Sequence, residues 1–210
     1  MSFSKQTLFL DLASHEKLLA LVTDGAATTM LRVNDHTQER ALMGTIETLL
    51  AQANTSLKDL TRIASVTGPG GFMSVRVGVS IANALAWSLK IPLAGVHLSD
   101  IWAIRAQSSK PKTQSFVWLH STKRNLLFIR GFGNYEDVWP EAVTLPIDDA
   151  TKLLSMDVPY VGELIDEHVR ALPGVKKIDD VAGIDQILPT LLGSLSDGNT
   201  PLEPWYGRGA

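Results

Sequence analysis

The chain has 210 residues, 45% of them hydrophobic, and its 19 basic and 22 acidic side chains give a formal net charge of −3. This composition can bury a substantial core, but it lacks the basic excess that holds nucleic acid by its phosphates. The absence of cysteine excludes disulfides, thiolate metal sites and a cysteine nucleophile. No apolar run reaches roughly 18 to 20 residues and no signal-peptide pattern opens the chain, so we expect a cytoplasmic protein without a membrane span.

Strand and helix patterns alternate in the first half of the chain. Apolar runs separated by short polar turns, one of them Asp24-Gly25, predict an antiparallel meander of three strands. Apolar residues at intervals of 4, 7, 8 and 11 from Leu42 indicate one face of a helix, for which Asp35 is the candidate N-cap. The predicted elements are strands at 7–13, 17–23 and 27–33, a helix at 37–53, a strand at 62–67, a helix at 74–90, a strand at 92–97 and a helix capped by Ser99.

The second half continues this alternation, with predicted strands at 115–120 and 126–132, a loop at 134–146, a helix at 148–154, a strand at 160–162 and a helix at 182–192. Meander, helix, strand and helix is the order of the ribonuclease-H-like subdomain, and its duplication gives the two-lobed architecture of actin, sugar kinases and heat-shock ATPases. We therefore expect an α/β, two-lobed, actin/heat-shock-ATPase-like (ASKHA) fold. Its first subdomain would span 1–105 and its second 106–210, with the C-terminal tail returning to the first.

The glycine turn Gly68-Pro69-Gly70-Gly71 joins a predicted strand to a predicted helix. Glycine permits positive φ, and amide groups beside a helix N-terminus favour an anion, so Gly68, Gly70 and Gly71 are candidate nucleotide- or phosphate-adjacent residues, together with Asp11 at the end of the first strand. The turn matches neither GxxxxGK[ST] nor GxGxxG, since Met73 stands in the last place of the latter pattern. A tight strand-to-helix connection is the alternative interpretation.

The helix after the turn carries two stripes with the same spacing. One stripe is apolar and is expected to pack on the sheet: Val75, Val79, Ala82, Ala86 and Leu89. The other combines small residues with one large aromatic ring: Arg76, Ser80, Asn83, Trp87 and Lys90. Little of this helix is suited to water, so the second stripe is covered either by the rest of the chain or by a partner.

Several motifs resemble those of a known family. The segment GPGGFMSVRVG at 68–78, followed by an alanine-rich helix and PLAGVHLSD at 92–100, resembles the GPGSFTGVRIG segment and the following strand of the TsaB (YeaZ) family. LDLAS at 10–14 resembles that family's LDTAT strand end, His36-Thr37 its helix start, and PWYGR at 204–208 its closing PxYLR. A match of eleven residues in the right strand, turn and helix context is much more specific than a lone glycine motif.

The resemblance implies a role in threonylcarbamoylation of the adenosine beside the anticodon of tRNAs that read codons starting with A. In the TsaB family the protein is not the catalyst but the partner of TsaD, the transferase subunit, and an ATPase, TsaE, joins them. For this chain alone, it therefore implies no catalytic activity, no intrinsic cofactor and no metal. ATP would belong to the complex interface, and tRNA would be contacted indirectly through the complex.

The resemblance also implies a pairing surface made by the helices at 37–53 and 74–90. On the first helix, the face opposite Leu42, Ile46 and Leu49 adds Gly44, Glu47, Thr48 and Ala51. The predicted partner-interface residues are these four together with Arg76, Ser80, Asn83 and Trp87. Trp87 is the expected anchor, and we expect the same surface to form a homodimer when the partner is absent.

Two enzymatic alternatives remain open. An ATP-dependent phosphotransferase or ATPase of the actin-like superfamily would use an acid at the end of the first strand, where Asp11 stands, to hold a metal-bound water. A metal-dependent, glycoprotease-like hydrolase would need a pair of helix histidines, but His36 is followed by Arg40 and Ala41 where a partner would stand, and no HExxH occurs. We expect all the histidines to be capping or surface residues: His15, His36, His97, His120 and His168.

Overall fold

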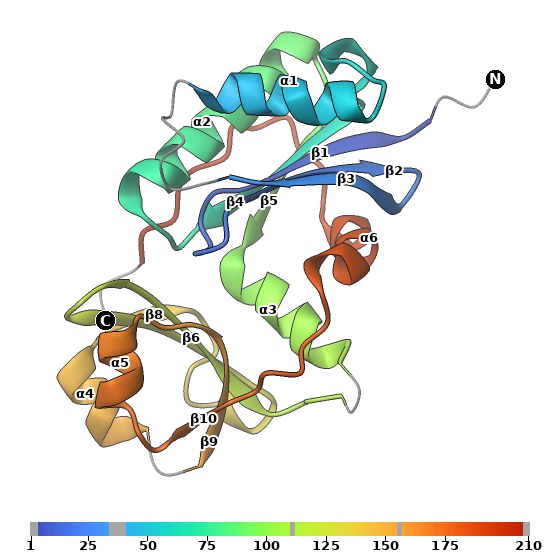
Figure 1. Ribbon diagram of the computed structural model, residues 1–210. Helices are drawn as coiled ribbons and strands as arrows, with labels where there is room; N and C mark the ends of the chain where they lie inside the picture. Colours follow the sequence, from blue (N-terminus) through green and yellow to red (C-terminus); the bar gives the residue numbers. More distant parts are fainter. Residues whose placement is uncertain (1–3, 34–40, 110–111, 155–156, 208–210) are drawn as a thin grey trace. The chain divides into compact units, whose positions relative to one another are not determined.

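The computed structural model describes residues 4–33, 41–109, 112–154 and 157–207, which form two compact units (Figure 1). Unit 1 contains the residues up to Leu98 together with Ile184–Trp205, and unit 2 contains Ser99–Gly183 and the residues after Trp205. The expected division placed a boundary after residue 105 and returned only the tail to the first subdomain. In the structure the boundary falls before Ser99, and the last helix also belongs to unit 1.

Unit 1 is built on a five-stranded sheet with the order β3-β2-β1-β4-β5. β1, β2 and β3 pair antiparallel, which confirms the predicted meander, and β4 runs parallel to both β1 and β5. The predicted helix start at His36-Thr37 and its N-cap Asp35 lie outside the described residues. The elements of the unit are β1 (Gln6–Asp11), β2 (Leu18–Thr23), β3 (Ala26–Arg32), α1 (Leu42–Gln52), β4 (Arg62–Gly68), α2 (Phe72–Leu89), β5 (Leu93–His97) and α6 (Ile184–Ser194).

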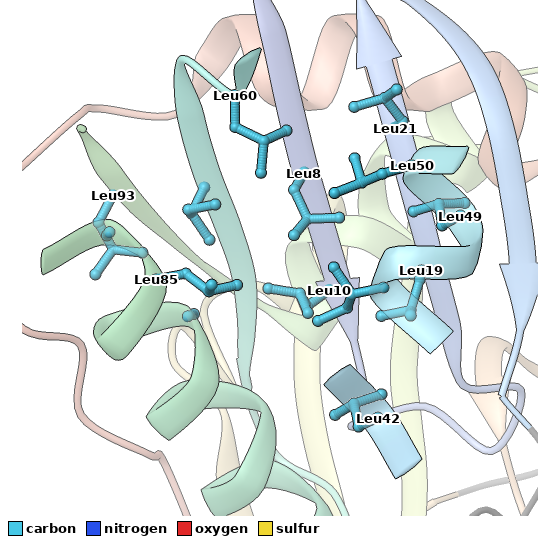
Figure 2. Packing of buried hydrophobic residues seen from close by; sticks show 14 of the residues in the cluster. Leu8, Leu10, Leu19, Leu21, Leu42, Leu49, Leu50, Leu60, Leu85 and Leu93 are labelled. Atoms are coloured by element: carbon cyan, nitrogen blue, oxygen red, sulfur yellow. The ribbon is translucent and has the colours of Figure 1, made fainter. Parts of the chain in front are cut away.

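A cluster of leucines forms the core of unit 1. Alternate residues of β1 and β2, among them Leu8, Leu10 and Leu19, point to one face of the sheet, where they meet Leu49 of α1 and Leu85 of α2 (Figure 2). Each fully buried leucine contributes roughly 1.5–3 kcal/mol relative to an exposed one. This cluster therefore holds α1 and α2 side by side on the same face, while α6 contacts β3 from the other side of the sheet (Figure 1).

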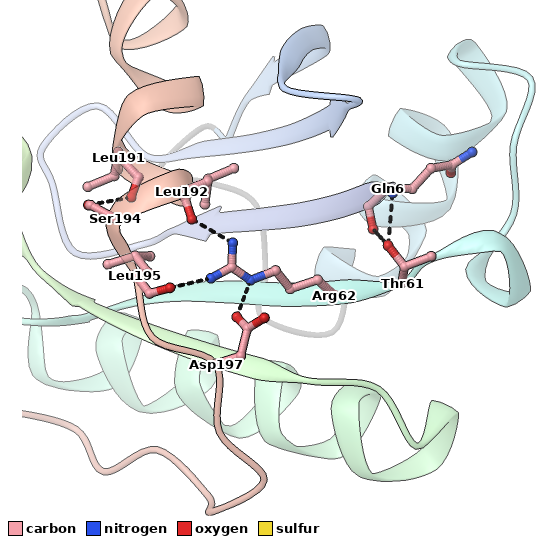
Figure 3. A network of polar contacts seen from close by, with 8 residues as sticks. All are labelled: Gln6, Thr61, Arg62, Leu191, Leu192, Ser194, Leu195 and Asp197. Carbon is pink, nitrogen blue, oxygen red and sulfur yellow. Dashed lines mark hydrogen bonds and ion pairs between the residues drawn. The ribbon is translucent and has the colours of Figure 1, made fainter. Parts of the chain in front are cut away.

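A buried arginine anchors the end of α6. The guanidinium of Arg62 in β4 donates to the carbonyl oxygens of Leu192 and Leu195 at 2.7 and 3.0 Å and pairs with the carboxylate of Asp197 (Figure 3). The last carbonyls of a helix have no partner within the helix and carry its partial negative charge, so a cation suits them. Arg62 thus ties the C-terminal region to the sheet of unit 1.

Unit 2 repeats this topology. Its five-stranded sheet has the order β10-β9-β6-β7-β8, with antiparallel β6–β7 and β7–β8 pairs and parallel β6–β9 and β9–β10 pairs. The second sheet therefore has the connectivity of the first, and the expected α/β fold of duplicated ribonuclease-H-like subdomains is confirmed. The elements are α3 (Leu98–Gln107), β6 (Phe116–Lys123), β7 (Leu126–Phe132), β8 (Val143–Pro146), α4 (Ile147–Leu153), β9 (Val158–Glu163), α5 (Asp166–Ala171) and β10 (Val175–Lys177).

The contact that ties α3 to the second sheet comes from Arg130 of β7. Its guanidinium lies 2.7 Å from a carboxylate oxygen of Asp100 and 2.9 Å from the hydroxyl of Ser99. Both partners lie in the first turn of α3, immediately after Leu98. A charge-assisted bond of this kind is stronger than a neutral one. Arg130 therefore holds the first turn of α3 to the second sheet, in agreement with a unit boundary that falls before α3.

Candidate docking surface

α2 presents one face to the sheet and another to solvent, as its spacing predicts. Val75, Val79, Ala82 and Ala86 are buried, whereas Arg76, Ser80 and Trp87 are exposed, and the Trp87 side chain reaches 85% exposure. Because α2 packs on the sheet through the first set, the second set faces away from unit 1. Trp87 is therefore an uncovered aromatic ring on a well-packed helix.

Asn83 is placed differently from the rest of its predicted stripe. Its side-chain amide Nδ2 donates to the carbonyl oxygen of Leu202 at 3.0 Å, and its Oδ1 accepts from the backbone amide of Leu202 at 2.8 Å. Asn83 is half-buried, and Ala84 takes the exposed position between Ser80 and Trp87. The sequence prediction missed this, because Leu202 lies 119 positions away along the chain.

The four residues predicted on α1 are all exposed. Their helix buries Leu42, Ile46, Leu49 and Leu50 against the sheet and turns the opposite side outward. Since α1 and α2 lie on the same face of the sheet (Figure 1), we consider the exposed residues on their outward sides together as one candidate surface. We call this surface the docking face and define it as Gly44, Glu47, Thr48 and Ala51 of α1 with Arg76, Ser80, Ala84 and Trp87 of α2.

Two further apolar side chains extend the exposed surface at the start of α2. Phe72 and Met73 are each about half exposed, and the guanidinium carbon of Arg76 lies 5.2 Å from the centre of the Phe72 ring. The sequence pattern predicts a helix that begins near Ser74, which places both residues in the preceding turn. In the structure α2 begins at Phe72, so both residues belong to the first turn of the helix.

The glycine turn is closely packed against the chain's own backbone. A Cβ atom at Gly70 would collide with the backbone of Ala13, and one at Gly68 would collide with the carbonyl oxygen of Trp205. At Gly71, by contrast, a Cβ atom would meet only ordinary contacts with Ser74, 3.5 Å away at the nearest. Two of the three glycines therefore have a packing cause that requires no phosphate.

Asp11 lies beside the glycine turn, and its side chain forms hydrogen bonds with the backbone that follows it. One carboxylate oxygen accepts from the backbone amides of Ala13 and Ser14, at 3.0 Å each, and the side chain is buried. The structure thus brings Asp11 and Gly70 together through the segment 11–14. Its hydrogen bonds are those of a carboxylate that shapes a strand end.

The expectation for the histidines is wrong for two of them, because His120 and His168 are fully buried in unit 2. The Nε2 atom of His168 lies 2.8 Å from the carbonyl oxygen of Arg124, which can only accept, so Nε2 carries a proton. In the neutral ring, Nδ1 then accepts from the hydroxyl of Ser121 at 2.7 Å. His168 joins α5 to β6 and its turn, a structural role that no local sequence signal indicates.

His120 has an acidic neighbour across the sheet. It stands opposite Glu163 in the parallel β6–β9 pairing, and its Nδ1 atom lies 3.4 Å from a Glu163 carboxylate oxygen. Of the other histidines, His15 is exposed, His97 is half-buried against the Trp205 ring, and His36 lies outside the described residues.

α2 is also long and apolar enough, by length and composition alone, to cross a membrane. This corrects the expectation that no segment reaches that length and hydropathy. A single helix of this kind is weak evidence for a membrane span, because core helices of globular proteins pass the same test.

A family model described as "TsaD: tRNA N6-adenosine threonylcarbamoyltransferase" matches residues 32–182, well over half of the chain. The chain belongs to this family. The tRNA threonylcarbamoyladenosine biosynthesis protein TsaB of Buchnera aphidicola is 31% identical over 94 residues, 45% of this chain and 42% of the relative. The tRNA N6-adenosine threonylcarbamoyltransferase of Nitrosospira multiformis is 31% identical over 156 residues, 70% of this chain and 44% of the relative. The chain thus spans less than half the length of these curated relatives.

Two solved structures from Pseudomonas aeruginosa match nearly the whole chain at 18% identity. YeaZ has a TM-score of 0.67 and covers 96% of this chain and 99% of its own. A protein described as similar to peptidase YEAZ has a TM-score of 0.69, with 97% and 100% covered. At this identity the likeness shows a shared fold. Together with the TsaB relative, it confirms the resemblance to TsaB (YeaZ) that the glycine-turn segment predicts.

Proposed function

We propose that this chain is a non-catalytic partner subunit that binds a TsaD-like transferase during threonylcarbamoylation of tRNA adenosine. The observation that carries the proposal is the docking face, where Trp87 is 85% exposed while Ser80 and Ala84 beside it are small. Exposed apolar area is unfavourable by roughly 25 cal/mol per Å². A buried tryptophan at the centre of an interface is a typical binding hot spot.

The small residues of the docking face suit helix packing. Gly44, Ala51, Ser80 and Ala84 leave room for a partner's helices to approach closely, and helix axes in packed pairs lie about 8–10 Å apart. The family model that describes TsaD matches a stretch containing both α1 and α2, so a TsaD-like relative is expected to carry an equivalent helix pair. Two such pairs would meet as a four-helix bundle.

The arrangement at the glycine turn supports a role without catalysis by this chain alone. Asp11 shapes the end of β1, and Gly68 and Gly70 are packed against the chain's own backbone. In our proposal, this chain has no intrinsic cofactor, and any ATP belongs to the complex interface. The ATPase alternative would give Asp11 a second task, holding a metal-bound water, beside its hydrogen bonds to Ala13 and Ser14.

The remaining parts of the proposal follow from the same family relation. A TsaE-like ATPase joins the complex, tRNA is contacted indirectly through it, and the site of action is the cytoplasm. When the partner is absent, the docking face pairs with a second copy, since a single exposed surface of this kind can also be covered symmetrically.

The experiment that tests the proposal is co-purification of the full chain with the TsaD-like relative encoded by the same genome. We expect one complex in size-exclusion chromatography with light scattering, and modification of tRNA only when both proteins and the ATPase are present. Two separate peaks at micromolar concentration would contradict the proposal.

A further inference from the structure

The C-terminal segment Gly198–Trp205, here called the strap, is anchored to unit 1 at both ends. Gly198 and Leu93 exchange two backbone hydrogen bonds of 2.9 Å on β5, which is an edge strand. The amide of Trp205 donates to the carbonyl oxygen of Thr67 at 2.8 Å, and its ring meets the His97 ring edge-on with centroids 4.6 Å apart. The strap therefore pairs with the edge strand at one end and is fixed to β4 and β5 at the other.

Between these anchors, the strap is held by α2. The side-chain amide of Asn83 uses both its donor and its acceptor on the backbone of Leu202, at 3.0 and 2.8 Å. The side chain of Leu202 packs against the leucine cluster that also holds Leu85 and Leu93. The side chain of Asn83 thus fixes a segment of the chain that lies 119 positions away.

Two glycines leave the space that the strap fills. A Cβ atom at Gly95 would lie 2.8 Å from a methyl carbon of Leu202, and one at Gly68 would collide with the carbonyl oxygen of Trp205. At Gly68 φ is +133°, a backbone conformation that favours glycine. The strap is therefore a fitted element of unit 1 that the sheet and α2 are shaped to receive.

We infer that the strap braces the docking face through Asn83, so that partner binding depends on a segment outside that face. Asn83 precedes Ala84 and lies about one helical turn from both Ser80 and Trp87, so fixing Asn83 fixes the C-terminal half of α2. A face that is ordered before binding loses less conformational entropy on binding. The inference rests on the proposed function for the identity of the partner, but the brace itself is a property of the free chain.

Amide hydrogen exchange of the free chain tests the brace without a partner. In Asn83→Ala we expect amides of Leu85–Leu89 and of the strap to exchange about five- to tenfold faster than in the wild type, as expected from the loss of two hydrogen bonds. The matched control is Ser56→Ala, which removes a hydrogen bond to Asp59 away from both α2 and the strap. Exchange in α2 that is the same in both variants would overturn the inference.

Binding to the TsaD-like relative then tests the consequence. We expect the Kd to rise about five- to tenfold in Asn83→Ala and in Leu202→Pro, which lacks the amide that Asn83 accepts from, and to stay unchanged in Ser56→Ala. Leu202→Pro also removes a side chain that packs on the core, so the double variant should bind about as weakly as Leu202→Pro alone, because the contact with Asn83 is then lost only once. Additive losses, or wild-type affinity in Asn83→Ala, would overturn the brace but leave the proposed function intact. A wild-type chain that does not bind the relative would contradict the proposed function. The hydrogen-exchange experiment on the free chain would then be the test of whether the strap fixes α2.

Discussion

The guanidinium of Arg62 lies 2.7 Å from the carbonyl oxygen of Leu192, 130 positions further along the chain, and it also holds Leu195 and Asp197. Replacing Arg62 with Met keeps most of the side-chain volume but removes these contacts. We expect Arg62→Met to lower the free energy of unfolding by about 3 kcal/mol, measured by urea denaturation. Asp197→Asn should lower the free energy of unfolding by about 1 kcal/mol or less. Asp197 is partly exposed, and the hydrogen bonds of Arg62 to the carbonyl oxygens of Leu192 and Leu195 remain. Equal stability of Arg62→Met and the wild type would show that α6 is held by other contacts.

Alanine substitutions separate the two interpretations of the glycine turn. Gly70→Ala should destabilise the chain by about 1–3 kcal/mol, because the added methyl group meets the backbone of Ala13. Gly71→Ala should stay within about 0.5 kcal/mol of the wild type, since its φ of −57° suits alanine and the added Cβ would meet only ordinary contacts. The measurement is the thermal midpoint of each variant. If both variants are equally stable, packing does not account for Gly70. A phosphate-binding role of the glycine turn would then be favoured.

The purified chain should not hydrolyse ATP in the presence of Mg²⁺. One carboxylate oxygen of Asp11 accepts from the amides of Ala13 and Ser14, and an asparagine at this position keeps an oxygen that can accept from both. We therefore expect Asp11→Asn to leave the thermal midpoint nearly unchanged, whereas Asp11→Ala should lower stability by about 1 kcal/mol. Measurable phosphate release that Asp11→Asn abolishes would favour the ATPase alternative.

The pKa of Asp59 lies below its ordinary value of 3.8, because the hydroxyl of Ser56 and then its backbone amide donate to the Asp59 carboxylate. A carboxyl group whose folded-state pKa is lowered stabilises the fold above its unfolded pKa, and this stability is lost as the pH falls through the folded value. Ser56→Ala should therefore raise the pKa of Asp59 in an NMR titration. The stability difference between this variant and the wild type should be full at neutral pH and shrink below about pH 4. A pKa that does not move would contradict the assignment.

Local periodicity predicted the order of the main elements and the buried face of α2. Val75, Val79 and Ala82 are where a period of 3.6 residues places them, because the core of unit 1 covers one side of the helix. The glycine turn likewise marked the junction between β4 and α2. Short elements were missed: β10 (Val175–Lys177) has three residues, and α5 (Asp166–Ala171) has six, too few for a pattern to stand out.

Contacts between distant residues account for the remaining differences. The side chains of Asn83 and His168 both look like surface residues in their own segments, yet Asn83 binds the strap and His168 binds Ser121. Spacing within a helix says nothing about partners that lie 119 and 47 positions away along the chain. The ion pair of Arg130 with Asp100, which holds α3 to the second sheet, likewise joins residues 30 positions apart.

Titration calorimetry of the complex shows whether the docking face binds a TsaD-like partner through Trp87. We expect Trp87→Ala to weaken binding by about 2 kcal/mol or more, roughly thirtyfold in Kd, and Ser80→Arg to abolish it by placing an unpaired charge between packed helices. Val138→Ala, which truncates another exposed apolar side chain but lies in unit 2, should bind as the wild type does. Circular dichroism should show all three variants folded. Wild-type affinity in Trp87→Ala, with Ser80→Arg also binding, would show that the partner binds elsewhere on the chain.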